Sequence, residues 1–338
     1  MKTFINLPPK INDAIFGILS SQERNDWVLR AVKLHDSYML RKQDGTYIND
    51  ALDALAYLAL RIPATYAQIY SAFLQIQEIN PSWNPRSILD IGSGPGTAVW
   101  AALDIWSSVK QARCIDKNKN LLFLGKEIME KASLAIDISL ECKDIIEMSH
   151  YENKYDLVII ANILNELTLS QQEILLKKAF DQCNGIMIII EPGTSIGVTI
   201  VQKVSKQFSG KANLLAPYIN NSFIFDPKIW IHFSQRFIRP EFQRRIRQHM
   251  RDSSLMASDW EDAKFAYVAI GKILPKEMIW GRCIGPVKKQ KGFLEMFVLT
   301  QSEIKQVKIF KKNKKEYDFA KNLQWGAVIK SLNDVNNY

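Results

Sequence analysis

The sequence predicts an α/β protein built on a mostly parallel sheet with helices on both faces. Two observations carry this prediction. Apolar runs of strand length alternate with amphipathic stretches of helix length after residue 86, and a glycine-rich turn joins the first such strand to the first such helix. Alternating strands and helices are typical of parallel sheets covered on both faces. The apolar and charged fractions, 47% and 23%, are those of an ordinary globular protein.

The elements follow in a clear order. Apolar residues recur at helical spacing over residues 11–77, and Pro63 is expected to break this helical stretch in two. A Pro-rich turn then precedes the strand-like runs SILDI, QARCID, YDLVIIA and GIMIIIEPG. The pattern is lost between residues 210 and 259, KFAYVAIGKI restores a strand, and two or three more strands are expected after it.

We therefore divide the chain of 338 residues into three regions, because it is longer than one core usually grows. Residues 1–80 are an N-terminal helical region. Residues 81–272 are the sheet-bearing, ligand-binding domain, with a basic and aromatic insertion at about 210–260. Residues 273–338 are a β-rich, basic C-terminal extension.

The glycine-rich turn indicates a nucleotide-like ligand. Gly92, Gly94 and Gly96 leave the backbone open to a ligand, and the following helix offers free N–H groups. A dinucleotide fingerprint needs G-x-G-x-x-G, but Thr97 stands where its third glycine belongs. The spacing D-x-G-x-G-x-G, which begins at Asp90, favours S-adenosylmethionine instead.

Two further carboxylates follow the next strands. Asp116 ends the second strand, where it can accept hydrogen bonds from both ribose hydroxyls, and Asp144 follows the third strand, near an adenine edge. Each alone could equally be a solvated loop residue; in order after the glycine turn they favour the cofactor. The predicted cofactor-binding residues are Asp90, Gly92, Ser93, Gly94, Gly96, Thr97, Asp116 and Asp144.

The positive charge lies in the C-terminal part of the chain. Residues 201–338 hold 25 Lys and Arg against 12 Asp and Glu, which favours a polyanionic partner such as RNA, although a solvated basic face is the plain alternative. If Pro240 opens a helix, three arginines share one face and two more lie on the approach. The predicted RNA-binding residues are Arg236, Arg239, Arg244, Arg247 and Arg251, with Trp230, Phe233 and Phe237 able to stack on bases. A charged helix face over an apolar core remains the alternative, and the lysine-rich segment KIFKKNKKEYDFAK adds a second basic patch or a solvated turn.

The cysteines and the N-terminal segment indicate where in the cell the protein is expected. Four cysteines lie far apart without a C-x-x-C pair, so neither a disulfide framework nor a metal site is predicted. Pro8 and Pro9 interrupt the apolar stretch that a signal peptide would need, and no segment is apolar enough to span a membrane. The expected location is the cytoplasm.

The segments DALAYLALRIPATYAQIYSAF, ILDIGSGPGTAVWAA, YDLVIIANILNEL, HFSQRFIRP and EDAKFAYVAI resemble, in this order, the Rsm-twenty-two family of methyltransferase-like proteins. The resemblance extends over residues 7–326. It implies a seven-stranded class I methyltransferase sheet, S-adenosylmethionine binding, and action on or during assembly of the small ribosomal subunit.

The resemblance also places a reaction site after the fourth strand. Asn162, Asn165 and Glu166 are the predicted catalytic residues, and Glu191 ends the fifth strand. Positioning can supply most of the rate enhancement in a methyl transfer. For Asn165 and Glu166, a helix cap and a first-turn carboxylate are at least equally good interpretations. Neither an Asn/Asp-Pro-Pro-Tyr signature nor a Pro-Cys pair is present, which disfavours methylation of exocyclic amines and of cytosine C5.

One departure from the family concerns an iron–sulfur cluster. Many members carry cysteines around the Ala-Pro and His-Phe-Ser-Gln-Arg segments, and these are associated with such a cluster. This chain has Tyr218 and Ile231 at those places, and neither can replace a thiolate. We predict that no cluster is held and that Tyr218, Phe223, Phe225 and Ile231 form an apolar plug.

The sequence thus predicts a methyltransferase-like protein that binds small-subunit ribosomal RNA and uses S-adenosylmethionine. Catalytic activity is left open. The alternatives are a non-catalytic ribosome-assembly factor that retains the cofactor pocket, and a methyltransferase for a protein or small molecule.

Overall fold

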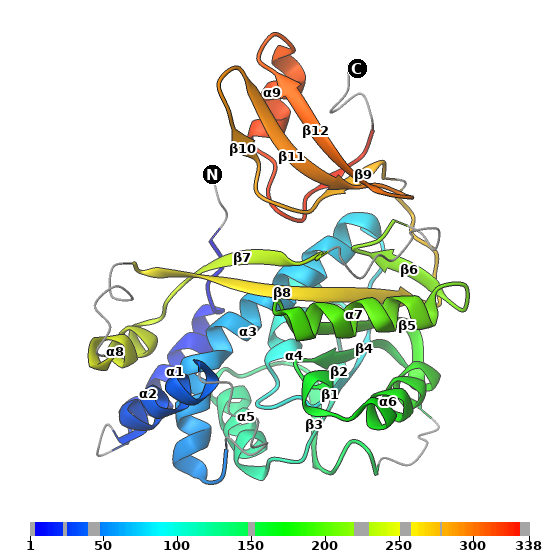
Figure 1. Cartoon of the computed structure of the whole chain (residues 1–338). Helices are drawn as coiled ribbons and strands as arrows, with labels where there is room; N and C mark the ends of the chain where they lie inside the picture. Colours follow the sequence, from blue (N-terminus) through cyan, green and yellow to red (C-terminus); the bar gives the residue numbers. More distant parts are fainter. Residues whose placement is uncertain are drawn as a thin grey trace.

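The computed structural model describes residues 4–22, 26–39, 48–147, 153–219, 230–250, 258–277 and 279–331. Within them the chain forms an eight-stranded sheet of order β3-β2-β1-β4-β5-β8-β6, with β7 paired to β8 (Figure 1). Its strands are β1 (Ser87–Ile91), β2 (Gln111–Asp116), β3 (Asp137–Cys142), β4 (Tyr155–Ala161), β5 (Cys183–Pro192), β6 (Asn213–Ala216), β7 (Phe233–Ile238) and β8 (Trp260–Gly271). The α/β class predicted from the sequence is confirmed.

The first five strands run parallel, and β8 runs antiparallel to both β5 and β6. Every residue of β1 is buried, as expected for a strand with helices on both sheet faces. The strand order reverses between β1 and β4, and the crevice beyond the carboxyl ends at such a point is where open α/β sheets bind ligands. The glycine turn leaves the sheet at this crevice.

The insertion at 210–260 contributes β6, β7 and α8 (Glu241–His249), although its sequence showed no regular pattern. β8 is 12 residues long. Its second half pairs with β5 and β6, while its first half pairs with β7, so that Phe233 lies opposite Phe265 and Ile238 opposite Trp260. The sheet therefore has eight strands in the described residues, where the resemblance implied seven.

The N-terminal helices are α1 (Pro9–Ser20), α2 (Asp26–Met39) and α3 (Ala51–Ile79), and α3 is one continuous helix of 29 residues. The break expected at Pro63 is wrong. A proline inside an isolated helix costs about 3 kcal/mol, but most of α3 is buried, and its packing against α4 (Thr97–Ile105), β7 and β8 offsets that cost. None of the helices that the structure describes is both long and apolar enough to cross a bilayer.

The remaining helices of the sheet-bearing domain connect parallel strands: α5 (Lys119–Lys131), α6 (Leu169–Gln182) and α7 (Ser195–Phe208). The C-terminal extension forms a second sheet, drawn above β7 and β8 in Figure 1. It comprises β9 (Gly281–Cys283), β10 (Lys288–Lys289), β11 (Phe293–Leu299), β12 (Ile304–Phe310) and β13 (Val328–Ile329), with α9 (Lys314–Lys321) against β11 and β12. The described part of this extension has five strands where two or three were expected, because β10 and β13 are only two residues long.

Candidate cofactor site

The turn between β1 and α4 has the left-handed backbone for which glycine is suited. Gly92, Gly94 and Gly96 have φ angles of 70°, 54° and 88°, a region that residues with a Cβ atom rarely adopt. The turn is held to the second strand. The Gly92 amide donates to the Ile115 carbonyl at 2.7 Å, and the Gly94 amide donates to Asp116 Oδ2 at 2.8 Å.

The three glycines differ in what surrounds them. A Cβ atom on Gly92 would lie 2.3 Å from Ile163 Cδ1, and one on Gly96 would lie 2.3 Å from Met129 Cε, so either would require that side chain to move. A Cβ atom on Gly94 would meet only Leu121 Cδ1, at an ordinary 3.8 Å. The space in front of Gly94 is therefore open to a ligand.

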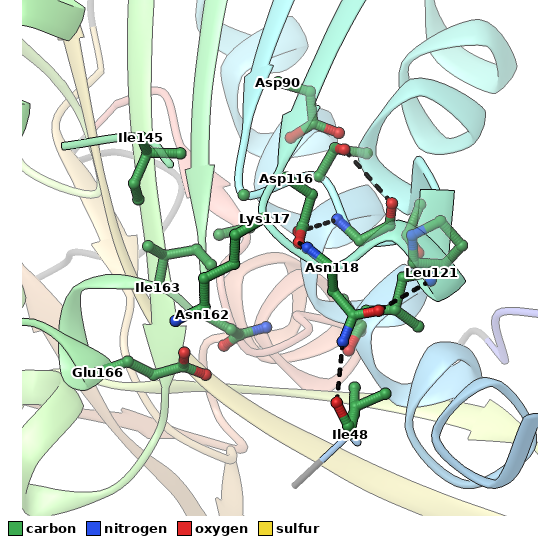
Figure 2. A pocket seen from close by; sticks show the side chains of 18 of the residues that line it. Ile48, Asp90, Asp116, Lys117, Asn118, Leu121, Ile145, Asn162, Ile163 and Glu166 are labelled. Carbon is green, nitrogen blue, oxygen red and sulfur yellow. Dashed lines mark hydrogen bonds between the residues drawn. The ribbon is translucent and has the colours of Figure 1, made fainter. Parts of the chain in front are cut away.

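A cavity of about 280 Å³ opens beside this turn, beyond the carboxyl ends of β1, β2 and β4. Figure 2 shows Asp90 and Asp116 approaching it from one side and Asn162 and Glu166 from the other. Predicted site residues that line it are Asp90, Gly92, Ser93, Gly94, Thr97, Asp116, Asp144, Asn162 and Glu166. Gly96 and Asn165 are not among the lining residues. The predicted residues that meet at this site span 76 residues of the chain, from Asp90 to Glu166.

Three buried polar atoms of the lining lack a hydrogen-bond partner within the described chain. They are Asp90 Oδ2, Thr97 Oγ1 and Asn162 Oδ1. Buried polar groups in folded proteins nearly always have partners, and leaving one unsatisfied costs about 1–3 kcal/mol. The cavity therefore offers acceptor and donor positions that a polar ligand would satisfy.

Asp90 and Asp116 give the cavity an acidic wall. Burial, together with the nearby Asp116 carboxylate, raises the pKa of Asp90 from 3.8 to about 8. Burial also raises the pKa of Asp116, although the backbone amides of Asn118 and Gly94 act in the opposite direction. An ionised Asp90 is costly here without a counter-charge. The wall is therefore suited to a ligand that carries positive charge or hydrogen-bond donors.

Asp116 is held in one orientation by backbone amides. Its Oδ1 accepts from the Asn118 amide and its Oδ2 from the Gly94 amide, each at 2.8 Å. Each carboxylate oxygen keeps a second lone pair, so both can still accept from a ligand hydroxyl. Asp144 is more exposed, and its Oδ1 accepts from the Ile146 amide at 2.8 Å, which shapes the loop after β3.

The residues after β4 divide into two groups. Asn162, at a φ of 58°, and Glu166 line the cavity, and burial raises the pKa of Glu166. Asn165 instead donates through Nδ2 to Glu191 Oε2 at 2.6 Å. Because that contact holds Asn165 outside the lining, the catalytic role predicted for it does not fit its position.

Glu191 is a fully buried carboxylate that fixes the turn after β4. Its Oε1 accepts from the backbone amides of Ile163 and Leu164 at 3.2 and 2.8 Å. Burial raises its pKa to about 7, and the hydrogen bond from Asn165 acts against that rise. Glu191 therefore positions the short helix η1 (Leu164–Glu166), and hence Glu166, at the cavity edge.

The helix α3 supplies a wall of the cavity that sequence analysis missed. The lining residues from this wall and the segment before it are Ile48, Tyr57, Ile62, Thr65 and Ile69. In addition, Gln68 accepts from Asn162 Nδ2 at 3.3 Å and donates to the Lys264 carbonyl at 2.9 Å. The segment PATY lies within one of the stretches that resemble the family, but nothing in its spacing indicated contact with the glycine turn.

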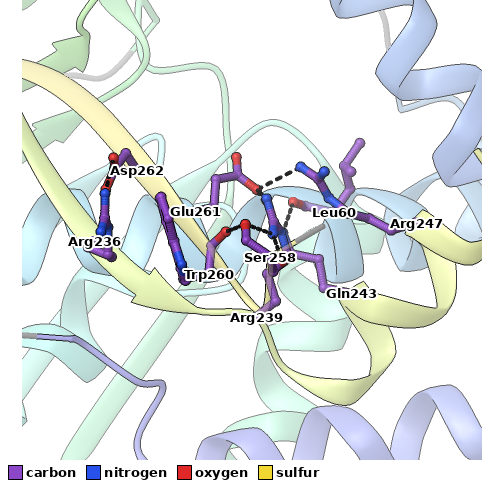
Figure 3. Close-up of polar contacts among 9 residues, drawn as sticks. All are labelled: Leu60, Arg236, Arg239, Gln243, Arg247, Ser258, Trp260, Glu261 and Asp262. Carbon is purple, nitrogen blue, oxygen red and sulfur yellow. Dashed lines mark hydrogen bonds and ion pairs between the residues drawn. The ribbon is translucent and has the colours of Figure 1, made fainter. Parts of the chain in front are cut away.

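The predicted RNA-binding arginines have different environments, shown for three of them in Figure 3. Pro240 stands at the N-cap position of α8, so a helix does begin there, as expected. The Arg239 side chain is only 4% exposed and donates to Glu261 and to the Ser258 carbonyl. An RNA contact by Arg239 does not fit this burial, so this prediction is corrected. Arg247 also pairs with Glu261, at 3.4 Å.

The other two described arginines differ in exposure, with the Arg236 side chain 16% exposed. Arg236 makes two 2.7 Å hydrogen bonds to Asp262 and stacks on Trp260, 3.3 Å from the ring centroid. Arg244 is 48% exposed and lies 4.0 Å from the exposed Asp259. Arg251 lies outside the described residues. Of the five, Arg244 is the one whose described surroundings best suit contact with a phosphate.

The aromatic residues and cysteines bear on the other predictions. Phe233 and Phe237 are buried, so they are not placed to stack on bases, whereas Trp230 is 54% exposed. Tyr218 and Ile231 of the expected plug are buried, while Phe223 and Phe225 lie outside the described residues. Across the described ranges, no group of three or more His, Cys, Asp and Glu side chains could hold a metal ion.

Comparison with known proteins identifies the family. The family described as "Mitochondrial small ribosomal subunit Rsm22" matches residues 51–330. The chain belongs to the Rsm22 family. The Rsm22 match includes α3, the glycine turn, the insertion and nearly all of the C-terminal extension, so the resemblance seen in the sequence is confirmed.

Two curated relatives are similar to the chain. The human ribosome assembly protein METTL17, mitochondrial, is 25% identical over 153 residues, which are 44% of this chain and 33% of the relative. The Rsm22-cox11 tandem protein 2, mitochondrial, of Schizosaccharomyces pombe is 25% identical over 198 residues, 52% of this chain and 26% of the relative. The matches thus span a third or less of these relatives' own lengths. Because both are named as mitochondrial proteins, the cytoplasmic location predicted from the sequence is wrong.

Two of the solved structures that are similar to the chain are named as methyltransferases. The plantazolicin methyltransferase BpumL is 12% identical with a TM-score of 0.38, covering 78% of this chain and 96% of that one. The magnesium protoporphyrin IX methyltransferase of Synechocystis PCC 6803 is 9% identical with a TM-score of 0.37, covering 72% of this chain and all of that one.

Proposed function

We propose that this protein binds S-adenosylmethionine and acts, as a methyltransferase-like factor, on or during assembly of the small ribosomal subunit, whose RNA it contacts. Membership of the Rsm22 family supports the ribosomal part. The mitochondrial location of the curated relatives is carried to this chain as part of the same proposal. The observation that carries the cofactor part is the open cavity in front of Gly94, with its three unpartnered polar atoms.

The cavity residues fit the parts of S-adenosylmethionine. Asp116, fixed by two backbone amides, would accept hydrogen bonds from the ribose hydroxyls. The loop at Asp144 and Ile145 would contact the adenine, and Asp90 would face the positively charged amino acid part. A positive ligand would stabilise the ionised form of Asp90, since an opposite charge lowers the pKa of a carboxyl.

When bound, the cofactor supplies an electrophilic methyl group. What this chain contributes to its transfer is the position of the acceptor. Asn162 is held by Gln68 from α3, and Glu166 is held by the Glu191 contacts to the turn after β4. Orientation of an acceptor at this edge can supply a large part of the rate enhancement without acid–base chemistry.

A non-catalytic assembly factor is the second candidate. The observation in its favour is that Asn165 and Glu191 bond to each other and do not line the cavity. Of the three predicted catalytic residues, only Asn162 and Glu166 remain to hold a methyl acceptor. In this alternative the cofactor would stabilise the domain rather than react. Binding a ligand to the native state alone raises the stability of that state.

Methyl-transfer assays on purified small subunits separate these candidates. The full chain is incubated with subunits and methyl-labelled cofactor, and label is sought in the RNA and in the proteins. Label in the RNA supports an RNA methyltransferase, and label in a protein means that the substrate is a protein instead. Binding of both subunit and cofactor without label supports the assembly factor, while absence of subunit binding contradicts the ribosomal proposal.

A further inference from the structure

The C-terminal extension contains a sheet face with unusual surface composition. Along β11 and β12, the buried side chains Leu294, Met296, Val307 and Ile309 face α9, where they pack with Tyr317 and Ala320. Since strand side chains alternate between faces, the intervening residues point away from α9. This outer face is composed of Phe293, Glu295, Phe297, Gln306, Lys308 and Phe310.

Phenylalanines on this outer face are exposed to solvent. Phe297 and Phe310 are 41% and 48% exposed, and Phe293 is partly buried. Phe293 lies directly opposite Phe310 in the strand register, with ring centroids 5.7 Å apart. Phe297 lies on the same face, four residues from Phe293 along β11, with the Glu295–Lys308 pair between them. Single exposed apolar residues need no explanation, but this face carries two aromatic sites about 13 Å apart, separated by charged side chains.

Positive charge borders the rings. Lys308 Nζ lies 5.6 Å from the centroid of the Phe293 ring, and Lys308 and Lys288 both lie opposite Glu295, on either side of it. Glu295 itself accepts from Gln306 Nε2 at 2.7 Å. Residues 281–330 as a whole hold 12 Lys and Arg against 4 Asp and Glu.

We propose that this outer face binds single-stranded RNA, with unpaired bases stacked on Phe297 and on the Phe293–Phe310 pair, and phosphates near the surrounding lysines. Exposed rings bordered by basic side chains are how sheet surfaces hold single strands, because every base has a π face and the backbone is anionic. A uniformly basic face would attract a duplex equally well, whereas rings need unpaired bases. The proposal rests on the RNA part of the proposed function and adds a second contact surface, distinct from α8.

Fluorescence anisotropy of the full chain with a labelled 12-nucleotide poly(U) RNA tests the proposal. The variant combines Phe297→Ala with Phe310→Ala. The control is Phe319→Ala, a phenylalanine of the same extension that is 40% exposed on α9. We expect the double variant to weaken binding at least tenfold, since stacking on one ring is worth about fivefold or more, and the control to stay within twofold. A duplex of the same length should bind the unmodified chain more weakly than the single strand.

A second variant tests the charge. Lys308→Gln should reduce the slope of log affinity against log salt by about 0.7, the value for one phosphate of a single strand. The proposal is overturned if the folded double variant binds poly(U) as tightly as the unmodified chain, or if Phe319→Ala weakens binding equally. Single and double strands bound alike, with no effect of the phenylalanines, would also overturn it. An unmodified chain that binds no RNA would refute the RNA part of the proposed function as well, while calorimetric cofactor binding would stand independently.

Discussion

At the scale of single residues, the cavity is defined by polar groups placed where they lack partners. Asp90 is the clearest of these, because it is 2% exposed, has an unpartnered oxygen and lies near a second carboxylate. Such a group destabilises the unliganded protein when it is ionised. Strain of this kind is characteristic of sites arranged for a ligand.

Stability without ligand should therefore depend on pH through Asp90. Its pKa is about 8 in the folded protein and 3.8 ordinarily, so between these values the folded state holds a proton that the unfolded state has lost. Its contribution to stability is present below pH 4 and is lost as pH rises towards 8. The stability difference between Asp90→Asn and the unmodified protein should therefore grow in favour of the variant as the pH rises from 5 to 8. The expected increase is more than about 1 kcal/mol, because one pKa unit is worth about 1.4 kcal/mol. Melting-temperature differences that stay constant over this pH range would contradict the assignment.

At the scale of elements, the ribbon formed by β7 and β8 orders the basic insertion. Phe233 and Phe237 point inward, where β7 packs against α3, while Arg236 points outward on the ribbon. Three arginines predicted to bind RNA, Arg236, Arg239 and Arg247, pair with Asp262 or Glu261 of β8. Arginine spacing alone could not show this, because their partners lie 14 to 26 residues further along the chain.

The arginines of this element should respond differently to substitution. Arg239→Ala removes a buried guanidinium and leaves the Ser258 carbonyl without its donor, so we expect a loss of about 1–3 kcal/mol in the free energy of unfolding. Arg244→Ala, at an exposed site, should change it by less than about 0.5 kcal/mol.

For RNA affinity, we expect the larger effect at Arg244 and the smaller one at the buried Arg239. Arg244→Glu is expected to weaken RNA binding and lower its salt dependence, because one phosphate contact is lost. Denaturant unfolding and anisotropy titrations measure the two effects. Equal stability losses for Arg239→Ala and Arg244→Ala would contradict the environments described for them.

At the scale of the whole molecule, the sequence predicted the elements that local patterns control. The parallel strands, the glycine turn and Asp116 at the end of β2 follow from apolar runs and from backbone conformations that only glycine adopts readily. The continuous helix α3, and the cavity wall that it forms, could not be predicted in this way, because packing across the molecule overrides the local effect of Pro63. The strands β6 and β7 were also missed, since both gain their stability by pairing with β8, which lies further along the chain.

The absence of a metal cluster is also a prediction for the whole protein. Cys114, Cys183 and Cys283 are buried and Cys142 is exposed. Within the described ranges, none of them belongs to a group of three or more His, Cys, Asp or Glu side chains that could hold a metal ion. Protein purified without oxygen should be colourless, contain no stoichiometric iron, and keep its melting temperature when a chelator is added. Several iron atoms per chain with broad visible absorption would refute this, and would require ligands from other parts of the chain.

Calorimetric titration with S-adenosylmethionine tests the central claim, that the cavity beside Gly94 is the cofactor site. Gly94→Ala is compared with Gly292→Ala, since both glycines have positive φ angles, 54° and 91°, and an added Cβ atom meets nothing closer than 3.8 Å at either. Both substitutions therefore strain the backbone, Gly292→Ala the more because its φ lies outside the left-handed helical region, and only at Gly94 does the new methyl group enter the cavity. We predict that the unmodified chain and Gly292→Ala bind one cofactor with similar affinity and that Gly94→Ala binds it at least tenfold more weakly. Equal affinity of all three proteins, or no binding by the unmodified chain, would contradict the account.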